Sequence, residues 1–265
     1  MISSAGVLYS LINAEEVIEL PIIMYHSVLK DKNKTSKYIV TPESVEEDLI
    51  YLTKCGYKSV RASDIIKYVA DGETLPEKPY LLTFDDGCYN NLTYVLPLLE
   101  KYDAYAVISV VGKYSEEFSQ SDEVNAAYSY LRWSDINTLK KSGRVEFANH
   151  SYNMHSIDEN RIGTKKISWE SESEYIKRFS EDCNKTQKLL KENCDIEPII
   201  YTYPFGAYCN ESNKYLNENG FVMTFSCTEG INAITRNMEC LKLLKRLNRH
   251  GNAQTEEFYI THKIK

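Results

Sequence analysis

The sequence predicts a single α/β domain in which about seven parallel strands form a closed or nearly closed barrel. Short apolar runs alternate with longer amphipathic stretches along most of the 265 residues, which is the pattern of repeated strand and helix units. The length fits one sizeable domain, and no linker or internal repeat separates two cores. About seven such units in one chain favour a barrel over an open sheet.

The expected strands are short runs rich in apolar, β-branched and aromatic residues. They cover residues 18–25, 57–60, 80–84, 104–111, 145–148, 199–203, 221–226 and 241–247. The run at 104–111 (AYAVISVV) is almost entirely apolar, as expected of a strand that is buried on both faces.

The expected helices lie between these strands and carry start and stop signals. The start signals are Thr41 with Pro42, Ser63 and Ser134, and the stop signals are Gly56 and Gly143. A further helix is expected at 92–101, and the longest one at 170–192, with an inner stripe of Ile176, Phe179, Cys183 and Leu190.

Composition and charge exclude several classes of protein. With 31 basic and 38 acidic residues the net charge is -7, so the chain lacks the basic surface that nucleic-acid binding requires. The 43% apolar and 26% charged residues are typical of a folded domain and exclude disorder, collagen and coiled coil. No stretch reaches the roughly 18 apolar residues of a membrane span. We therefore expect neither a nucleic-acid partner nor a stable membrane span.

The first 19 residues are expected to form a segment separate from the domain at 20–265. Residues 1–14 (MISSAGVLYSLINA) are mildly apolar and end in a small residue before two glutamates, which resembles the end of an export signal or an anchor. No Lys or Arg precedes the apolar part, so a truncated export segment and a plain β-strand both stay open. Export would place the protein outside the cell or at its surface.

Two adjacent carboxylates follow the expected strand at 80–84. Successive side chains on a strand point to opposite faces, but a turn permitted by Gly87 would aim both Asp85 and Asp86 into one cavity. The alternative is an ordinary turn, in which Asp–Gly pairs are common.

Two of the five histidines, His150 and His155, follow the expected strand at 145–148. On a helix they would lie about 140° apart, so we expect a loop to bring them together. With Asp86 they make a set of two imidazoles and one carboxylate that suits Zn²⁺, or else Co²⁺, Ni²⁺ or Mn²⁺, and leaves positions for water and substrate. Asp85 is then free to act as a general base, so metal-assisted hydrolysis is expected.

These residues resemble the signatures of the polysaccharide deacetylases, the NodB-type carbohydrate esterases. Thr83-Phe84-Asp85-Asp86-Gly87 looks like the first signature, His150-Ser151-x-x-x-His155 like the second, and Tyr203-Pro204-Phe205-Gly206 like the third. The resemblance spans roughly residues 20 to 260. It implies a distorted (β/α) barrel and metal-dependent removal of acetyl groups from N-acetylated sugars.

The resemblance also implies a role for each matching residue. Asp85 corresponds to the catalytic base, and the metal ligands correspond to Asp86, His150 and His155. The third signature lines the substrate site, with the backbone N–H of Tyr203 as a candidate oxyanion donor.

The chain departs from the family pattern in two places. Thr202 stands where the third signature usually has an Arg that orients the base, and Arg246 or Arg161 are candidates to replace it, unless both are surface charges. The C-terminal Leu-x-His signature, which supplies the general acid, is not matched by His250 or His262.

A different histidine is the better candidate for the general acid. Met24-Tyr25-His26 looks like the N-terminal signature of the branch that includes exopolysaccharide (poly-N-acetylglucosamine) deacetylases. In that branch this histidine takes the place of the missing acid, so the resemblance implies that His26 protonates the leaving amine. A histidine that only packs in the core is the alternative.

The chain contains 21 tyrosines, and several aromatic residues lie near the signatures. Aromatic rings stack on the flat C–H faces of sugars, which makes Trp133, Tyr152, Tyr203 and Phe205 candidates for substrate binding. Core packing is the alternative for each ring.

The sequence therefore predicts a hydrolase that removes N-acetyl groups from an N-acetylglucosamine-containing cell-surface polysaccharide and releases acetate. Two alternatives stay open: an amidohydrolase that acts on a small molecule, and a non-catalytic carbohydrate- or metal-binding surface protein with the same fold.

Overall fold

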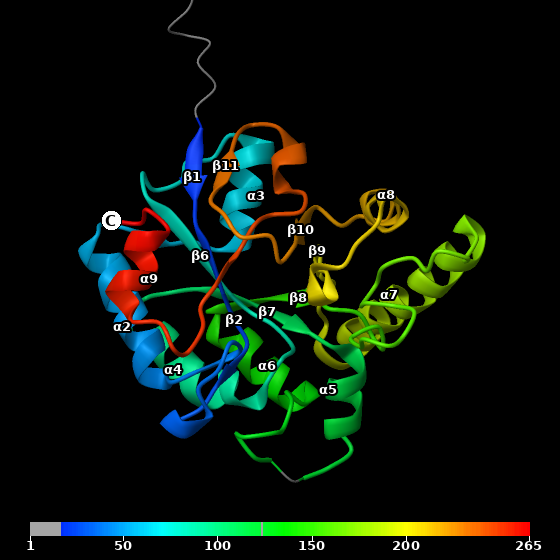
Figure 1. Cartoon of the computed structure of the whole chain (residues 1–265), viewed down its shortest axis with the longest axis horizontal. Helices are drawn as coiled ribbons and strands as arrows, with labels where there is room; N and C mark the ends of the chain where they lie inside the picture. The colour runs from blue at the N-terminus through cyan, green and yellow to red at the C-terminus, as the bar shows by residue number, and fades with distance from the viewer. Residues whose placement is uncertain (1–16, 123) are drawn as a thin grey trace, which may run out of the picture.

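The computed structural model describes residues 17–122 and 124–265. Within them, seven parallel strands form a curved sheet in the order β10-β9-β8-β7-β6-β2-β12, and β5 pairs with the start of β6 (Figure 1). The strands are β2 (Ile22–Tyr25), β5 (Lys58–Ser59), β6 (Pro79–Phe84), β7 (Ala106–Val110), β8 (Val145–Asn149), β9 (Ile200–Thr202), β10 (Met223–Phe225) and β12 (Leu247–Asn248). The predicted barrel of about seven parallel strands is confirmed.

The segment that contains β12 contacts both ends of this sheet. Leu244 forms a parallel bridge with Phe225 of β10, and β12 pairs with β2 a few residues later. The predicted strand at 241–247 is wrong over most of its length, because Leu243 has a φ of 52° and an extended strand cannot pass through that left-handed conformation. Residues 244–248, which we call the closing segment, still bring the sheet close to a complete barrel.

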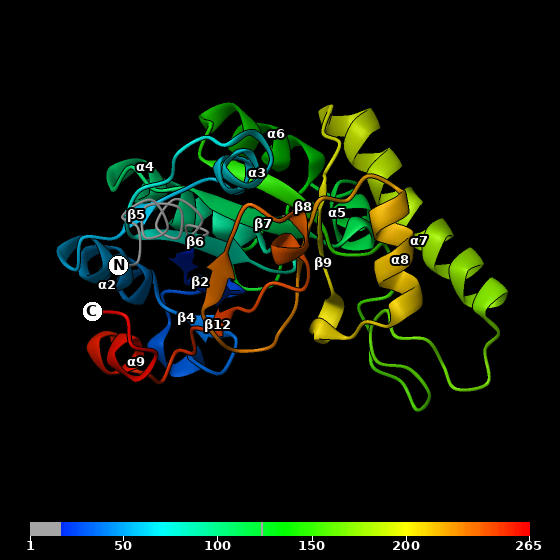
Figure 2. The same cartoon turned by 90° about the horizontal axis from the view of Figure 1, so that it is seen from above.

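Helices surround the strands in an outer layer (Figure 2). They are α2 (Pro42–Lys54), α3 (Ala62–Asp71), α4 (Leu96–Lys101), α5 (Gly112–Phe118), α6 (Trp133–Ser142), α7 (Glu172–Cys194), α8 (Asn210–Glu218) and α9 (Thr255–Thr261). The figure shows α8 beside α7, and α9 beside α2 near the C-terminus. None of the described helices is both long and apolar enough to cross a membrane.

The barrel strands are buried on both faces. In β6, Leu81 belongs to the cluster inside the barrel with Ile22 and Val107, whereas Leu82 belongs to the cluster under the helices with Leu49 and Leu139. Strands that are covered on both faces consist of nearly continuous apolar residues, so the sequence pattern predicted them.

The N-terminal boundary differs from the prediction. Pro21 divides the expected strand at 18–25 into β1 (Ile18–Leu20) and β2, and β1 pairs antiparallel with β11 (Asn232–Ile234) outside the barrel. Ile18 and Glu19 are therefore part of the folded domain and not of a separate segment. The export-like stretch at 1–14 lies outside the described residues.

Two predicted helix caps are wrong. The cap of α3 is Arg61, whose N–H donates to the Asp64 carboxylate (3.0 Å), and Ser63 lies inside the helix. The cap of α6 is Arg132, held in the same way by Asp135 (2.9 Å), and Ser134 lies inside that helix. In both cases the carboxylate of an acidic residue at the third helical position accepts the hydrogen bond that the N–H of the cap residue donates.

Other helix boundaries also moved or were missed. The expected helix at 92–101 begins as a π-helical turn (η2, Asn91–Val95) before α4, and Ser171 caps α7 two residues later than expected. Several elements were not predicted from the sequence: α5, α8, α9, the short pair β3 (Ser27–Val28) and β4 (Ile39–Val40), and the 3-10 turns η1 (Lys32–Lys34), η3 (Pro204–Gly206) and η4 (Met238–Leu241).

Candidate active site

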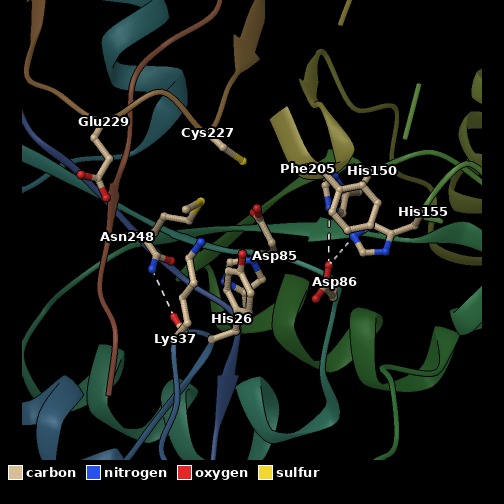
Figure 3. A pocket seen from close by; sticks show the side chains of 12 residues that line it. His26, Lys37, Asp85, Asp86, His150, His155, Phe205, Cys227, Glu229 and Asn248 are labelled. Atoms are coloured by element: carbon tan, nitrogen blue, oxygen red, sulfur yellow. Dashed lines mark hydrogen bonds and ion pairs between the residues drawn. The ribbon is translucent and has the colours of Figure 1, made fainter. Parts of the chain in front are cut away.

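A cavity of about 370 Å³ opens at the carboxyl ends of the barrel strands (Figure 3). Its walls come from residues in β2 and β12, from the residues that follow β2, β6, β8, β9 and β10, and from the segment before β4. The lining residues are Met24, His26, Lys37, Tyr38, Asp85, Asp86, His150, His155, Phe205, Cys227, Glu229 and Asn248. The predicted base, general acid and three metal ligands therefore share one cavity.

A left-handed turn aims the two adjacent carboxylates into this cavity. Asp86 has a φ of 70° and Gly87 a φ of 69°, so the chain leaves the extended conformation immediately after Asp85. Asp is among the few residue types with a side chain that tolerate this region. The predicted turn is confirmed, and it begins one residue before Gly87.

A loop brings the two histidines together, as expected. Ser151 has a φ of 66° and ends the extended run of β8 at His150. The carboxylate of Asp182 on α7 accepts hydrogen bonds from the N–H groups of Tyr152 (2.8 Å) and Asn153 (2.7 Å), which holds the start of this loop. A residue distant in sequence thus supports the second signature.

His150 is held in one tautomer by the strand beside it. Its Nδ1 lies 2.7 Å from the carbonyl oxygen of Thr202, and because a carbonyl only accepts, Nδ1 carries the proton. The lone pair then lies on Nε2, which faces Asp86. This arrangement is typical of imidazoles that bind metals.

The residue set fits a divalent metal ion. One ligand atom from each of Asp86, His150 and His155 lies within 4.8 Å of the others. Asp86 Oδ1 is 3.0 Å from Nε2 of His155 and 3.5 Å from Nε2 of His150, yet it is buried and accepts no hydrogen bond from the described residues. Ligand atoms that converge without satisfying one another, and that combine two imidazoles with a carboxylate, are expected where a cation such as Zn²⁺ binds.

Asp85 is held by Arg246 of the closing segment. Nη1 and Nη2 of Arg246 donate to the two carboxylate oxygens at 2.7 and 2.8 Å, and Nε donates to the carbonyl of Ser226 at 2.9 Å. Arg246 is fully buried. Burial would raise the pKa of Asp85, but the charge and hydrogen bonds of Arg246 outweigh it and hold that pKa at about 2.

Arg246 therefore holds Asp85 in place, which is the role of the third-signature arginine that Thr202 replaces in this chain. Arg161, the other candidate, lies 3.8 Å from Asp158 in an ion pair near the surface and does not line the cavity.

His26 enters the cavity beside Asp85. Its ring packs against Tyr38 with 4.7 Å between the ring centroids, and its Nδ1 is buried with no hydrogen-bond partner among the described residues. Burial lowers the pKa of His26, although the nearby charges of Asp85 and Asp86 oppose this effect. His250 and His262 do not line the cavity, and Nδ1 of His262 lies 2.8 Å from the carbonyl of Phe258.

Phe205 is the one predicted sugar-binding residue that borders the cavity. Its ring lies 4.6 Å from that of His155 and is 41% exposed. Its φ of 58° is unusual for a bulky residue, and such conformations are found where a site needs a side chain aimed in one direction.

The other predicted substrate-binding residues lie elsewhere. Tyr203 is buried and its hydroxyl donates to Asn213 (2.6 Å), while its backbone N–H already donates to the carbonyl of Phe225 (3.1 Å), so it is not a free oxyanion donor. Pro204 is buried, and Gly206 lies against Cys227.

Two further aromatic residues were assigned to the wrong environment. Trp133 begins α6 and packs against the core, because the face of that helix turns towards the barrel. Tyr152 lines a separate surface depression with Arg161 and Lys185, because the left-handed turn at Ser151 directs it away from the metal ligands.

Several lining residues were not predicted from the sequence. Lys37, Tyr38, Glu229 and Asn248 belong to loops or strand ends without a recognisable motif. Only the packing of distant segments brings them to the cavity, so no local pattern could have identified them.

Comparison with known proteins assigns the family. A family model described as polysaccharide deacetylase matches residues 72–224. The poly-beta-1,6-N-acetyl-D-glucosamine N-deacetylase of Escherichia coli (strain K12) is 26% identical over 255 residues, which cover 89% of this chain and 37% of that protein. The protein of the same name from Staphylococcus aureus (strain MRSA252) is 25% identical over 202 residues, covering 76% and 64% respectively. This chain thus spans less than two thirds of these relatives.

Solved structures share the fold. A de-N-acetylase from Aggregatibacter actinomycetemcomitans superposes with a TM-score of 0.76 at 23% identity, covering 91% of this chain and 99% of the other. The Streptococcus pyogenes deacetylase PplD, solved with acetate, gives a TM-score of 0.73 at 20% identity, covering 93% and 99%. With the family model matching more than half of its length, this chain belongs to the polysaccharide deacetylase family.

Proposed function

We propose that this chain removes N-acetyl groups from N-acetylglucosamine residues of a cell-surface polysaccharide and releases acetate. One observation carries the proposal: an ionised carboxylate, Asp85, is fixed by Arg246 in the same cavity as the Asp86, His150 and His155 set. Two relatives are named for poly-beta-1,6-N-acetyl-D-glucosamine, which makes this polymer the first candidate substrate. A surface polymer implies an extracellular or surface location.

Asp86, His150 and His155 are the proposed ligands of a divalent metal, with Zn²⁺ as the first candidate. When bound, such an ion polarises the acetyl carbonyl and lowers the pKa of water. Asp85 accepts the proton of the attacking water. The low pKa of Asp85 keeps it ionised at neutral pH, and Arg246 is a positioning residue that fixes the direction of its oxygens.

His26 is the proposed general acid. Protonation of the amine nitrogen allows the C–N bond to break. His26 lines the cavity beside Asp85, and no described residue forms a hydrogen bond with its Nδ1. Because burial lowers the pKa of His26, its protonated form is a stronger acid than an exposed imidazolium and transfers its proton readily to the leaving nitrogen. Replacing His26 with Ala is expected to lower kcat by about 10² to 10⁴.

Acetate release tests the proposed function directly. The metal-loaded protein should release acetate from poly-β-1,6-N-acetylglucosamine oligomers, with chito-oligosaccharides and peptidoglycan as comparison substrates. Acetate from small N-acetyl compounds alone would favour an amidohydrolase. No acetate from any polymer despite bound metal would contradict the proposal and favour a non-catalytic binding protein.

A further inference from the structure

One end of the cavity is not used by the proposed mechanism. Lys37, Glu229 and Asn248 line it, opposite the end that holds His150 and His155 (Figure 3). Tyr38, which also lines the cavity, follows Lys37 in the chain and packs against His26. All four lie outside residues 72–224, the part that the family model matches. They come from the segment before β4, the connection between β10 and β11, and the closing segment. This end is therefore built by parts of the chain that the family signatures do not include.

Two hydrogen-bond acceptors at this end have no partner within the described part of the chain. Asn248 is 9% exposed, and its Nδ2 donates to the carbonyl of Lys37 (3.1 Å), which leaves its buried Oδ1 without a donor. Glu229 is exposed and forms no ion pair with a described residue. A buried acceptor without a donor is costly, so Oδ1 of Asn248 favours a ligand that brings an N–H or O–H group. The carboxylate of Glu229 favours a ligand with positive charge.

An exposed aromatic ring stands beside these acceptors. Tyr38 is 47% exposed and its ring packs against His26, the proposed donor of a proton to the leaving nitrogen. A sugar on this ring would be next to the sugar whose amide is hydrolysed. Nζ of Lys37 lies 5.1 Å from the centroid of the same ring. No ion pair joins Lys37 and Glu229, so the carboxylate oxygens of Glu229 are free to contact a ligand.

We propose that this end of the cavity binds a glucosamine residue, with a free ammonium group, that neighbours the hydrolysed N-acetylglucosamine in the polymer. The ammonium group lies between Glu229 and Oδ1 of Asn248, and the sugar ring covers Tyr38. The inference rests on the proposed function. Each deacetylation then creates a better substrate for the next, and the net charge of -7 favours the cationic polymer that results.

The test compares two oligomers of equal length, one fully N-acetylated and one with a single glucosamine beside an N-acetylglucosamine. The readout is the ratio of their kcat/KM values for acetate release. Wild type should prefer the second oligomer, and Glu229→Gln should reduce this ratio by up to about fivefold, as expected for an exposed charge pair. The preference should weaken at high salt.

Two further variants make the test specific. Lys37→Met should raise the ratio, because it removes a positive charge that repels the ammonium group. Glu218→Gln removes the same charge as Glu229→Gln from the end of α8, outside the cavity, and should leave the ratio unchanged. An effect of Glu218→Gln equal to that of Glu229→Gln would overturn the inference, since it would reflect net charge alone.

Stacking on Tyr38 is measured separately. Tyr38→Ala should lower kcat/KM for the oligomers about threefold to tenfold relative to N-acetylglucosamine itself, and Tyr38→Phe should restore it. Equal ratios in wild type and Glu229→Gln would overturn the glucosamine subsite even if the fully acetylated oligomer releases acetate. Acetate from neither oligomer would overturn the proposed function and the inference with it.

Discussion

Arg246 and Arg249, three residues apart, each form a buried ion pair with an aspartate. Arg246 binds Asp85, and Nε of Arg249 lies 2.9 and 3.1 Å from the two carboxylate oxygens of Asp48 on α2. Side chains three apart on an extended segment point to opposite faces. The first pair consequently faces the cavity, whereas the second lies between the barrel and α2.

The surroundings of the two carboxylates differ. Asp48 also accepts a hydrogen bond from the hydroxyl of Tyr25 (2.7 Å) and does not line the cavity. Burial raises the pKa of Asp48 to about 6 despite the charge of Arg249, whereas Arg246 holds the pKa of Asp85 at about 2. Burial and pairing alone thus do not distinguish a reactive carboxylate from a structural one. Access to the cavity does, because only Asp85 lies where a substrate and a bound metal could reach it.

Metal removal should have the largest effect, and it should act only on the chemistry next to the first pair. After treatment with a chelator, acetate release should fall to the chemical background and return when Zn²⁺ is added, because the ion supplies the polarisation of the carbonyl. Metal content by mass spectrometry accompanies the assay. Full activity in metal-free protein would contradict the assignment of Asp86, His150 and His155.

Replacing each aspartate by asparagine should have the next largest effect, and it should distinguish the catalytic pair from the structural pair. Asp85→Asn should lower kcat by about 10² to 10⁴ because the general base is lost, while the bound metal stays because its ligands are unchanged. Asp48→Asn should change the free energy of unfolding at pH 7 by less than about 1 kcal/mol, because the raised pKa of Asp48 means that the folded state favours a neutral side chain at this position. The folded Asp48→Asn protein should keep kcat close to wild type. A similar loss of kcat in both variants would remove the distinction.

The matched substitutions Arg246→Lys and Arg249→Lys should have smaller effects. Lysine keeps the charge but loses the two parallel hydrogen bonds of a guanidinium. Arg246→Lys should lower kcat about tenfold to a hundredfold with little change in KM, because Asp85 is no longer fixed. Arg249→Lys should lower stability by about 1–3 kcal/mol without changing kcat. A changed KM in Arg246→Lys would indicate a role in substrate binding.

The pH dependence of stability should also distinguish the two pairs. The pKa of Asp48 is about 6 in the folded protein and 3.8 for an ordinary aspartate, so between these values the folded state binds a proton that the unfolded state releases. This stabilisation is present below pH 3.8 and is lost as pH rises through 6, about 3 kcal/mol in total. Urea unfolding of wild type and Asp48→Asn from pH 4 to 7 measures it. Parallel curves for the two proteins would contradict the assignment.

Local sequence predicted the parts of the site that lie on one strand and its following turn. Asp85 and Asp86 follow β6, and His150 and His155 follow β8, so each pair is contiguous and its spacing is readable. Contacts between residues that are distant in sequence could not be predicted from local spacing. Arg246 was one of two candidates for the partner of Asp85. It lies 161 positions after Asp85 in the sequence, and no local pattern distinguishes it from the other candidate, Arg161.

The aromatic predictions show where local reasoning fails. Tyr203 and Trp133 lie in or near a signature, but both pack into the core, and the exposed Tyr38 next to His26 was not identified. A residue can be close to a signature in the sequence and still point away from the cavity. The direction of its side chain depends on how its helix is rotated and on the geometry of the preceding turn.

By itself the sequence determined the alternating strands and helices, the two carboxylates and the two histidines, because periodicity and short-range spacing are local properties. The tertiary structure decided which arginine holds Asp85, which rings meet the cavity and what lines its far end. The left-handed conformation of Leu243 ends the expected strand and sets the register of the closing segment. That register places Arg246 inside the barrel and Arg249 outside it, which no local pattern specifies.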